Sequence, residues 1–194
     1  MPALHAEPLA EAPLRDLFRR TRARSESMVE GLAPEDMTVQ SMEAASPTKW
    51  HLAHVSWFFE EFVLRPHAPG YRSPDDRFAY LFNSYYVQAG PRYSRAQRGL
   101  VTRPTVAEIM AYRDAVSDAV ERLIIAGDAP RDVVELGCHH EMQHQELILT
   151  DLLHVFSHNP MRPAYRAPEP LPTRDAVPLE WRHFDGGIVE IGHG

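Results

Sequence analysis

The residues of this sequence that can do chemistry are mainly histidines. The 194 residues include eleven histidines and a single cysteine, Cys138. His140 and His144 are four positions apart in a segment that we predict to be helical. Side chains at this spacing project from one face of a helix, roughly 5–6 Å apart, so two imidazoles can reach the same ion. We therefore predict a metal site on this helix.

The same segment matches the H-E-x-x-H pattern of zinc proteases, in which the glutamate is the general base. One common form of that motif requires a glycine three residues after the second histidine, and a third histidine three residues later. Leu147 and Thr150 stand at those positions, and the apolar pattern of the helix continues past them. We therefore do not expect a protease. We interpret Glu141 as a group that supports the ligands or lies at the surface.

A third ligand must come from another helix. His51 and His54 are three positions apart in an aromatic-rich segment, so both can face roughly the same way. His54 shares its stripe with Trp50 and Trp57, and a histidine on a core stripe needs a partner. The spacing leaves His51 and His54 as alternatives, and the core stripe favours His54. Three histidines without a thiolate leave coordination positions free, as in catalytic sites, and are compatible with Zn(II), Fe(II), Ni(II) or Mn(II).

Other polar side chains can contact a substrate of such a site. Gln143 lies about 60° from His140 on a helical wheel, beside the predicted ligands. A tyrosine-rich segment carries four arginines, whose planar guanidinium groups can bind a carboxylate through two hydrogen bonds. These arginines are Arg92, Arg95, Arg98 and Arg103. The segment is therefore a candidate carboxylate site.

Four helices are predicted to position these residues. Their starts carry capping signals, such as the pattern Thr-x-x-Glu at Thr105, and their ends carry glycine or proline. The predicted helices cover about residues 8–30, 46–65, 105–127 and 131–157. A short loop joins the last two, so we expect an all-α four-helix bundle. Residues 68–104 form an unusually long connection, which usually indicates function or disorder.

Composition excludes several classes of protein. The formal charge of −7 argues against nucleic-acid binding, which needs a basic surface. No segment approaches the roughly 20 apolar residues of a membrane span, and the first residues do not resemble a signal peptide. The single cysteine rules out an internal disulfide, which suits a reducing compartment. We expect a cytoplasmic protein that contacts neither membranes nor nucleic acids.

The composition changes after Pro160. We interpret residues 1–160 as the helical domain with the metal site, and residues 161–180 as a proline-rich linker. In residues 181–194, the turn at Gly186 and Gly187 precedes a short pattern typical of a strand. A single strand is not stable alone, so we expect this segment to begin a second, β-containing domain.

Several motifs together resemble the ergothioneine-biosynthesis sulfoxide synthases. The motifs occupy residues 46–54, 82–86, 90–92, 98–100, 103–105 and 140–147. That family is similar to DinB-like four-helix bundles at its amino terminus and continues into an α+β domain that resembles the formylglycine-generating enzyme. Residues 184–192 look like the first residues of that second domain, including its first strand.

The resemblance implies a particular chemistry. Family members hold non-haem iron(II) with three histidines, which fall here on His54, His140 and His144. With O2, they join the thiol of γ-glutamylcysteine or cysteine to the imidazole of Nα-trimethylhistidine (hercynine) and form a sulfoxide. Gln143 stands where the family contacts the hercynine imidazole. Arg95 and Arg98 are our candidates for binding the carboxylate of the thiol substrate.

The chain departs from the family because it ends at Gly194. The family's second domain supplies an active-site tyrosine, so no catalytic residue is assigned here, and we expect this chain alone to bind metal with little synthase activity. Three alternatives remain open. They are a selenoneine synthase with a selenium donor, a DinB-like zinc-dependent thiol transferase related to the mycothiol- and bacillithiol-dependent enzymes, and a metal-binding scaffold without turnover.

Overall fold

The computed structural model describes residues 14–167 and 177–192. Four long helices form the bundle, and two short α-helices, one π-helical turn and two 3-10 turns lie between them. The long helices are α1 (Leu14–Val29), α2 (Thr48–Phe59), α5 (Val106–Ala126) and α6 (Arg131–His158). The short elements are the π-helical turn Glu60–Leu64, α3 (Arg65–His67), α4 (Phe78–Leu81) and the 3-10 turns Val87–Ala89 and Arg95–Leu100.

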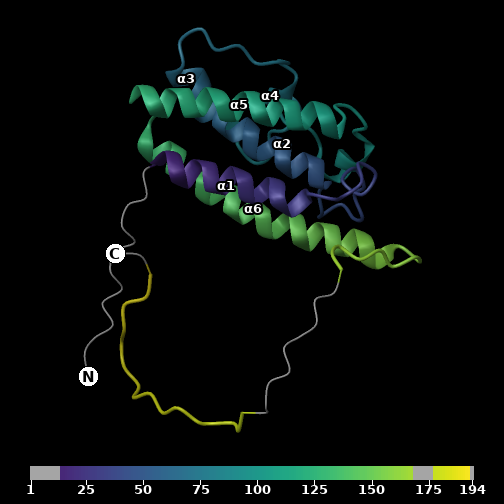
Figure 1. The fold of residues 1–194 in the computed structure, drawn as a ribbon, viewed down its shortest axis with the longest axis vertical. Coiled ribbons are helices and arrows are strands. Elements are labelled where there is room, and N and C mark those ends of the chain that lie inside the picture. Colours follow the sequence, from purple (N-terminus) through teal and green to yellow (C-terminus); the bar gives the residue numbers. More distant parts are fainter. Residues whose placement is uncertain (1–13, 168–176, 193–194) are drawn as a thin grey trace.

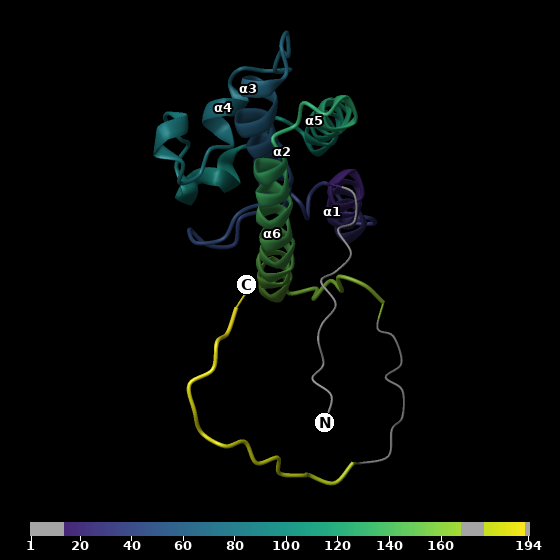
Figure 2. The same ribbon diagram turned by 90° about the vertical axis from the view of Figure 1, so that its left-hand side faces the viewer.

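Each long helix packs against two others. α2 contacts α5 and α6, and α1 contacts the same two helices (Figure 1). Figure 2 shows that α4 and the segment after it extend from the side of the bundle away from α1. The all-α fold expected from the sequence is therefore present, and the long connection is ordered by short helical turns.

The helix boundaries follow local signals closely. At the start of α5, the Thr105 side chain accepts a hydrogen bond from the Glu108 backbone, and the Glu108 carboxylate accepts one from Thr105 N–H at 2.6 Å. Gly127 ends the helix in the left-handed conformation at φ 78°. The second helix begins at Thr48 and ends at His67, two residues later than expected at each end, because the chain continues through the π-helical turn into α3 and past Pro66. Residues 8–13 of the predicted first helix lie outside the described residues.

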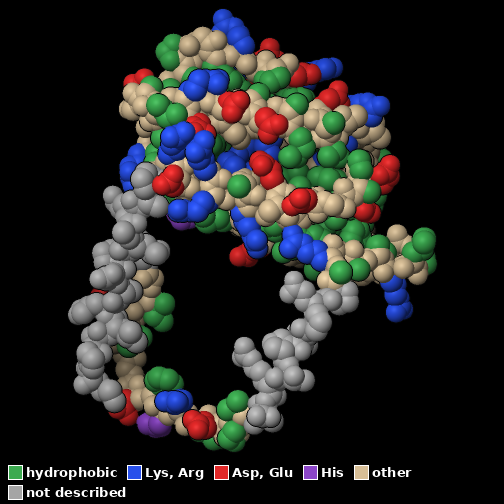
Figure 3. Space-filling model, in the orientation of Figure 1, with side chains coloured by type: hydrophobic (Ala, Val, Ile, Leu, Met, Phe, Trp, Pro, Cys, Tyr) green, Lys and Arg blue, Asp and Glu red, His purple; other side chains and the backbone are tan. Residues whose placement is uncertain are grey.

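The core is centred on α2, in which every residue from Thr48 to Phe59 is buried. Gly137 of α6 allows the two helices to approach closely. A Cβ atom at this position would lie 2.5 Å from a ring carbon of Phe59. The surface, in contrast, mixes charges of both signs (Figure 3). Arg15 of α1, for example, pairs with Glu121 of α5 at 2.5 Å.

The strand expected at the chain end is absent, since none of the described residues forms a strand. Residues 177–192 are exposed throughout, including Trp181 and Ile188. An isolated extended segment has no neighbouring strand to bond its backbone, so the strand pattern alone does not produce a strand here.

Residues 168–176 of the predicted linker and the last two residues lie outside the described part. No described helix has the length and apolarity needed to cross a membrane.

Candidate metal centre

His54 of α2 and the pair His140 and His144 of α6 meet between the two helices. One ring nitrogen from each lies within 4.8 Å of the others. His54 and His144 are 2% and 8% exposed, while His140 is half-buried. The cluster therefore sits at the edge of the core, and His140 is its most exposed member.

The orientation of His54 is fixed from two directions. Its Nδ1–H donates to the Phe82 carbonyl oxygen at 2.6 Å, because a carbonyl can only accept. The Nε2 atom therefore carries a lone pair. The imidazole also lies parallel to the indole rings of Trp50 and Trp57, with centroid distances of 4.6 and 5.4 Å. These contacts hold the ring as a preorganised donor.

All three histidines favour the neutral form that metal ligands need. Burial lowers the pKa of His140 to about 4. Burial, together with the neighbouring imidazoles, holds the pKa values of His54 and His144 well below the ordinary histidine range. The Nδ1 atom of His140 is buried and has no hydrogen-bond partner in the described residues. Three neutral imidazoles, one with an unpartnered nitrogen, fit a divalent transition metal.

His51, the rival third ligand, is not part of this cluster. It lies behind His144, with their Nδ1 atoms 2.8 Å apart. Its Nε2 atom is 3.0 Å from Oδ2 of Asp151. Burial lowers the pKa of His51 despite this carboxylate. His51 is thus a buried histidine with two protein partners.

Glu141 has a different role from the glutamate of a zinc protease. It is fully buried and binds Arg22 of α1 at 3.0 Å and Arg113 of α5 at 2.6 Å. Ser25 donates to the same carboxylate at 2.6 Å. Burial alone would raise the pKa of Glu141, but the two arginines and these hydrogen bonds outweigh it and lower the pKa to about 2. A carboxylate held this way is a poor base, and the expectation of a surface position was wrong.

The predicted substrate-contacting residues differ in their surroundings. Gln143 is exposed on α6 next to His144, and its amide makes no hydrogen bond to another described residue. Arg95 is exposed and donates to the Tyr85 hydroxyl at 2.6 Å and to the Ala44 carbonyl. Gln143 and Arg95 therefore remain accessible to a ligand.

Arg98, in contrast, is buried and engaged within the protein. Its guanidinium carbon lies 3.3 Å from the centroid of the Trp50 ring. Its amino groups donate to Ser46 at 2.9 Å and to Ser84 at 3.2 Å. Burial lowers the pKa of Arg98 to about 9. These contacts join three of the sequence motifs around α2.

The sequence analysis missed Asp151 and the two arginines of the Glu141 cluster. Asp151 follows His144 by seven positions, which is about two turns of α6 and places it on the same face. That spacing could have identified Asp151 as a neighbour of the predicted ligands. The sequence gives no such signal for Arg22 and Arg113. Each lies among other charged residues on its helix, and the local sequence does not show which helix packs against it.

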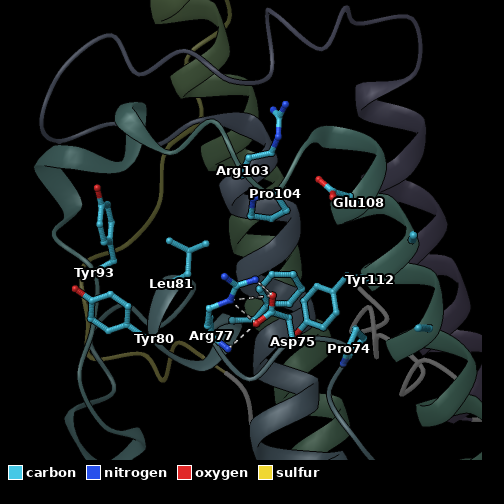
Figure 4. A pocket seen from close by; sticks show the side chains of 13 residues that line it. Pro74, Asp75, Arg77, Tyr80, Leu81, Tyr93, Arg103, Pro104, Glu108 and Tyr112 are labelled. Atoms are coloured by element: carbon cyan, nitrogen blue, oxygen red, sulfur yellow. Dashed lines mark hydrogen bonds and ion pairs between the residues drawn. The ribbon is translucent and has the colours of Figure 1, made fainter.

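A pocket lies elsewhere, between the α4 region and α5. It has a volume of about 680 Å3 and is lined by Phe78, Tyr80 and Leu81 on one side and by Glu108 and Tyr112 of α5 on the other (Figure 4). None of the clustered histidines lines it. The histidines carry the more specific chemistry, so we place the functional centre there.

Comparison with known protein families agrees with this fold. The family model of the DinB superfamily matches residues 17–148, which is more than half of the chain. The chain belongs to the DinB superfamily. This region contains all three clustered histidines. A search of curated proteins gives no match.

Proposed function

We propose that this chain carries the iron(II) centre of an O2-dependent sulfoxide synthase that joins a cysteine-containing thiol to hercynine. The observation that carries the proposal is the cluster of His54, His140 and His144, in which His140 is only half-buried and the neighbouring Gln143 is exposed. Three imidazoles leave other coordination positions of an octahedral ion for substrates. A purely structural metal site would be closed by a fourth protein ligand.

Three of the motifs that resemble the synthase family contact one another beside this cluster. Phe82 accepts the hydrogen bond of His54, and Arg98 links Ser46 to Ser84 across the face of Trp50. These residues come from separate parts of the chain. The contacts among these three motifs, one of which supplies the hydrogen-bond partner of a candidate ligand, support the proposal.

Each residue has a distinct role in the proposed reaction. The three histidines hold the iron, which when bound supplies the electron transfer to O2 that thiol oxidation needs. Gln143 orients the hercynine imidazole by hydrogen bonding. Arg95 binds a substrate carboxylate, and Arg98 holds the loop that carries Arg95. Holding both substrates near one ion replaces a slow encounter in solution by an oriented one.

The test is metal content and substrate binding in anaerobically purified protein. We expect stoichiometric iron and a change in the EPR spectrum of the iron–nitric oxide adduct when hercynine is added. Histidine, which lacks the trimethylammonium group, is the control ligand. Gln143→Leu is expected to retain iron and lose most of the hercynine response, whereas Met142→Leu, the exposed neighbour, keeps both. Iron binding without any hercynine response in the unmodified protein would overturn the proposal.

The second candidate function is a zinc-dependent thiol transferase. Superfamily membership and the three-histidine cluster also support it. The same experiment distinguishes it from the sulfoxide synthase. Stoichiometric zinc, with a thiol that binds in the absence of hercynine, would favour that function. A selenoneine synthase would share the iron and the hercynine response. Replacing the thiol by a selenium donor in the binding assay distinguishes it from the sulfoxide synthase.

A further inference from the structure

Asp151, His51 and His144 form a continuous chain of hydrogen bonds. Oδ2 of Asp151 lies 3.0 Å from Nε2 of His51, and Nδ1 of His51 lies 2.8 Å from Nδ1 of His144. The Ser46 backbone N–H donates to the same Asp151 oxygen at 2.8 Å. Asp151 and His51 are 7% and 2% exposed. The chain runs from the amino-terminal end of α2 to one of the clustered histidines.

The donors and acceptors in this chain allow one consistent arrangement of protons. The Asp151 carboxylate only accepts, so Nε2 of His51 carries a proton and donates it. With His51 neutral, its Nδ1 is an acceptor, and Nδ1 of His144 must then be the donor. That leaves the lone pair of His144 on Nε2. The opposite arrangement would place a proton on Nε2 and prevent this atom from binding a metal.

We propose that Asp151 and His51 are positioning residues that hold His144 in the tautomer whose Nε2 atom binds the metal. The inference rests on the metal centre of the proposed function and extends it to two residues that do not touch the ion. His54 is fixed in the same tautomer by a backbone carbonyl. The two ligands are therefore oriented by different means, His54 by the backbone of Phe82 just after α4 and His144 by the side chains of His51 and Asp151.

Hydrogen-bonded partners of a metal ligand, such as His51 and Asp151, have a measurable effect on metal affinity. Partners that orient a metal-binding histidine typically contribute 10- to 100-fold to affinity. We expect His51→Leu, which cannot accept a hydrogen bond, to weaken zinc binding about 10- to 100-fold in a chelator competition assay. His51→Gln can accept from His144 through its oxygen and donate to Asp151 through its nitrogen. It is therefore expected to recover most of the loss.

Variants at Asp151 separate orientation from charge. In Asp151→Asn, the Ser46 N–H can only donate, so it holds the amide oxygen of the new side chain in place. That oxygen can still accept the hydrogen bond from His51. We expect a loss of only a few-fold. Asp151→Ala removes the acceptor, and its loss is expected to approach that of His51→Leu. His139→Gln is the matched control, because His139 is an exposed histidine of the same helix and should bind zinc normally.

The tautomer itself can be observed without any variant. In metal-free protein labelled with 15N-histidine, two-bond 1H–15N correlations are expected to show His144 protonated at Nδ1. Protonation at Nε2, or unchanged zinc affinity in His51→Leu, would overturn the inference. Unmodified protein that binds neither iron nor zinc would instead overturn the proposed function, while the 15N spectrum would still decide the proton arrangement. The two failures are thus distinguishable.

Discussion

The imidazole of His54 lies parallel to the indole of Trp50, with their centroids 4.6 Å apart and their planes at 14°. The guanidinium group of Arg98 stacks on the same indole, 3.3 Å from its centroid. Trp50 also donates from Nε1 to the Leu81 carbonyl at 3.2 Å. The arginine-bearing loop, α4 and the candidate metal ligand therefore meet at one side chain. A change at Trp50 should affect both the stability of the fold and the geometry of the metal centre.

Replacing Trp50 tests this relationship. Trp50→Ala should lower the free energy of unfolding by about 3–5 kcal/mol, because it leaves a large cavity in the core. Trp50→Phe keeps a ring against His54 but loses the hydrogen bond to Leu81, so about 1 kcal/mol is expected. Urea unfolding of the metal-free protein measures both values. Trp181→Ala is the control, since Trp181 is 90% exposed and its removal should have no effect.

Metal should stabilise the protein through the three histidines. A ligand that binds only the folded state at 100 times its dissociation constant adds about 2.7 kcal/mol. Thermal unfolding with increasing zinc should therefore show a rising midpoint, and excess EDTA should reverse the rise. His54→Ala should abolish the response, while His139→Ala should keep it. A full zinc response in His54→Ala would show that the ion binds at another site.

Glu141 should be needed for folding stability. The carboxylate joins Arg22 and Arg113 in the interior, and removing one member of a buried ion pair leaves uncompensated charge. Glu141→Gln should lower the free energy of unfolding by about 3–5 kcal/mol. Glu146→Gln, at an exposed position of α6, should change it little. Equal stability of the two variants in urea unfolding would show that the buried cluster contributes nothing measurable.

The sequence was sufficient for features that depend on neighbours along the chain. The capping box at Thr105, the left-handed end of α5 at Gly127, and the shared face of His140 and His144 all follow from local spacing. The choice of His54 over His51 did not follow from spacing, because both positions face the core. The family resemblance favoured His54, and the structure explains the difference by giving His51 other partners.

Features that depend on contacts between distant segments were not predictable in this way. Glu141 meets Arg22 from α1, more than a hundred positions away, and nothing local indicates that pairing. The strand pattern near Ile188 likewise predicts a strand only if another strand lies beside it. Neighbouring strands come from elsewhere in a chain or from another chain, so local alternation is insufficient evidence.

The capping box of α5 should contribute a stability that depends on pH. Hydrogen bonds from Thr105 lower the pKa of Glu108 below its ordinary value of 4.5. The stabilising effect of the carboxylate is therefore complete above pH 4.5 and is lost as the pH falls through the lower, folded pKa. Thr105→Ala should cost about 1 kcal/mol at pH 7, and less at pH 3. Urea unfolding at both values checks this, and a cost that grows at low pH would contradict it.

Gly137 should be intolerant of even a methyl group, although alanine favours helices over glycine by about 1 kcal/mol. A Cβ atom there would lie 2.5 Å from the ring of Phe59 and 3.0 Å from the ring of Phe58. Overpacking of a core contact typically costs 1–3 kcal/mol, so Gly137→Ala should be destabilising overall. The ring of Phe58 also packs 4.8 Å from that of His140, so displacing it should weaken metal binding as well. Thr150→Ala, at an exposed position of the same helix, adds alanine without overpacking the core and should leave zinc affinity unchanged. If Gly137→Ala were instead more stable than the unmodified protein, α2 and α6 could separate without cost, and the close packing of the two helices would not be what holds the histidines together.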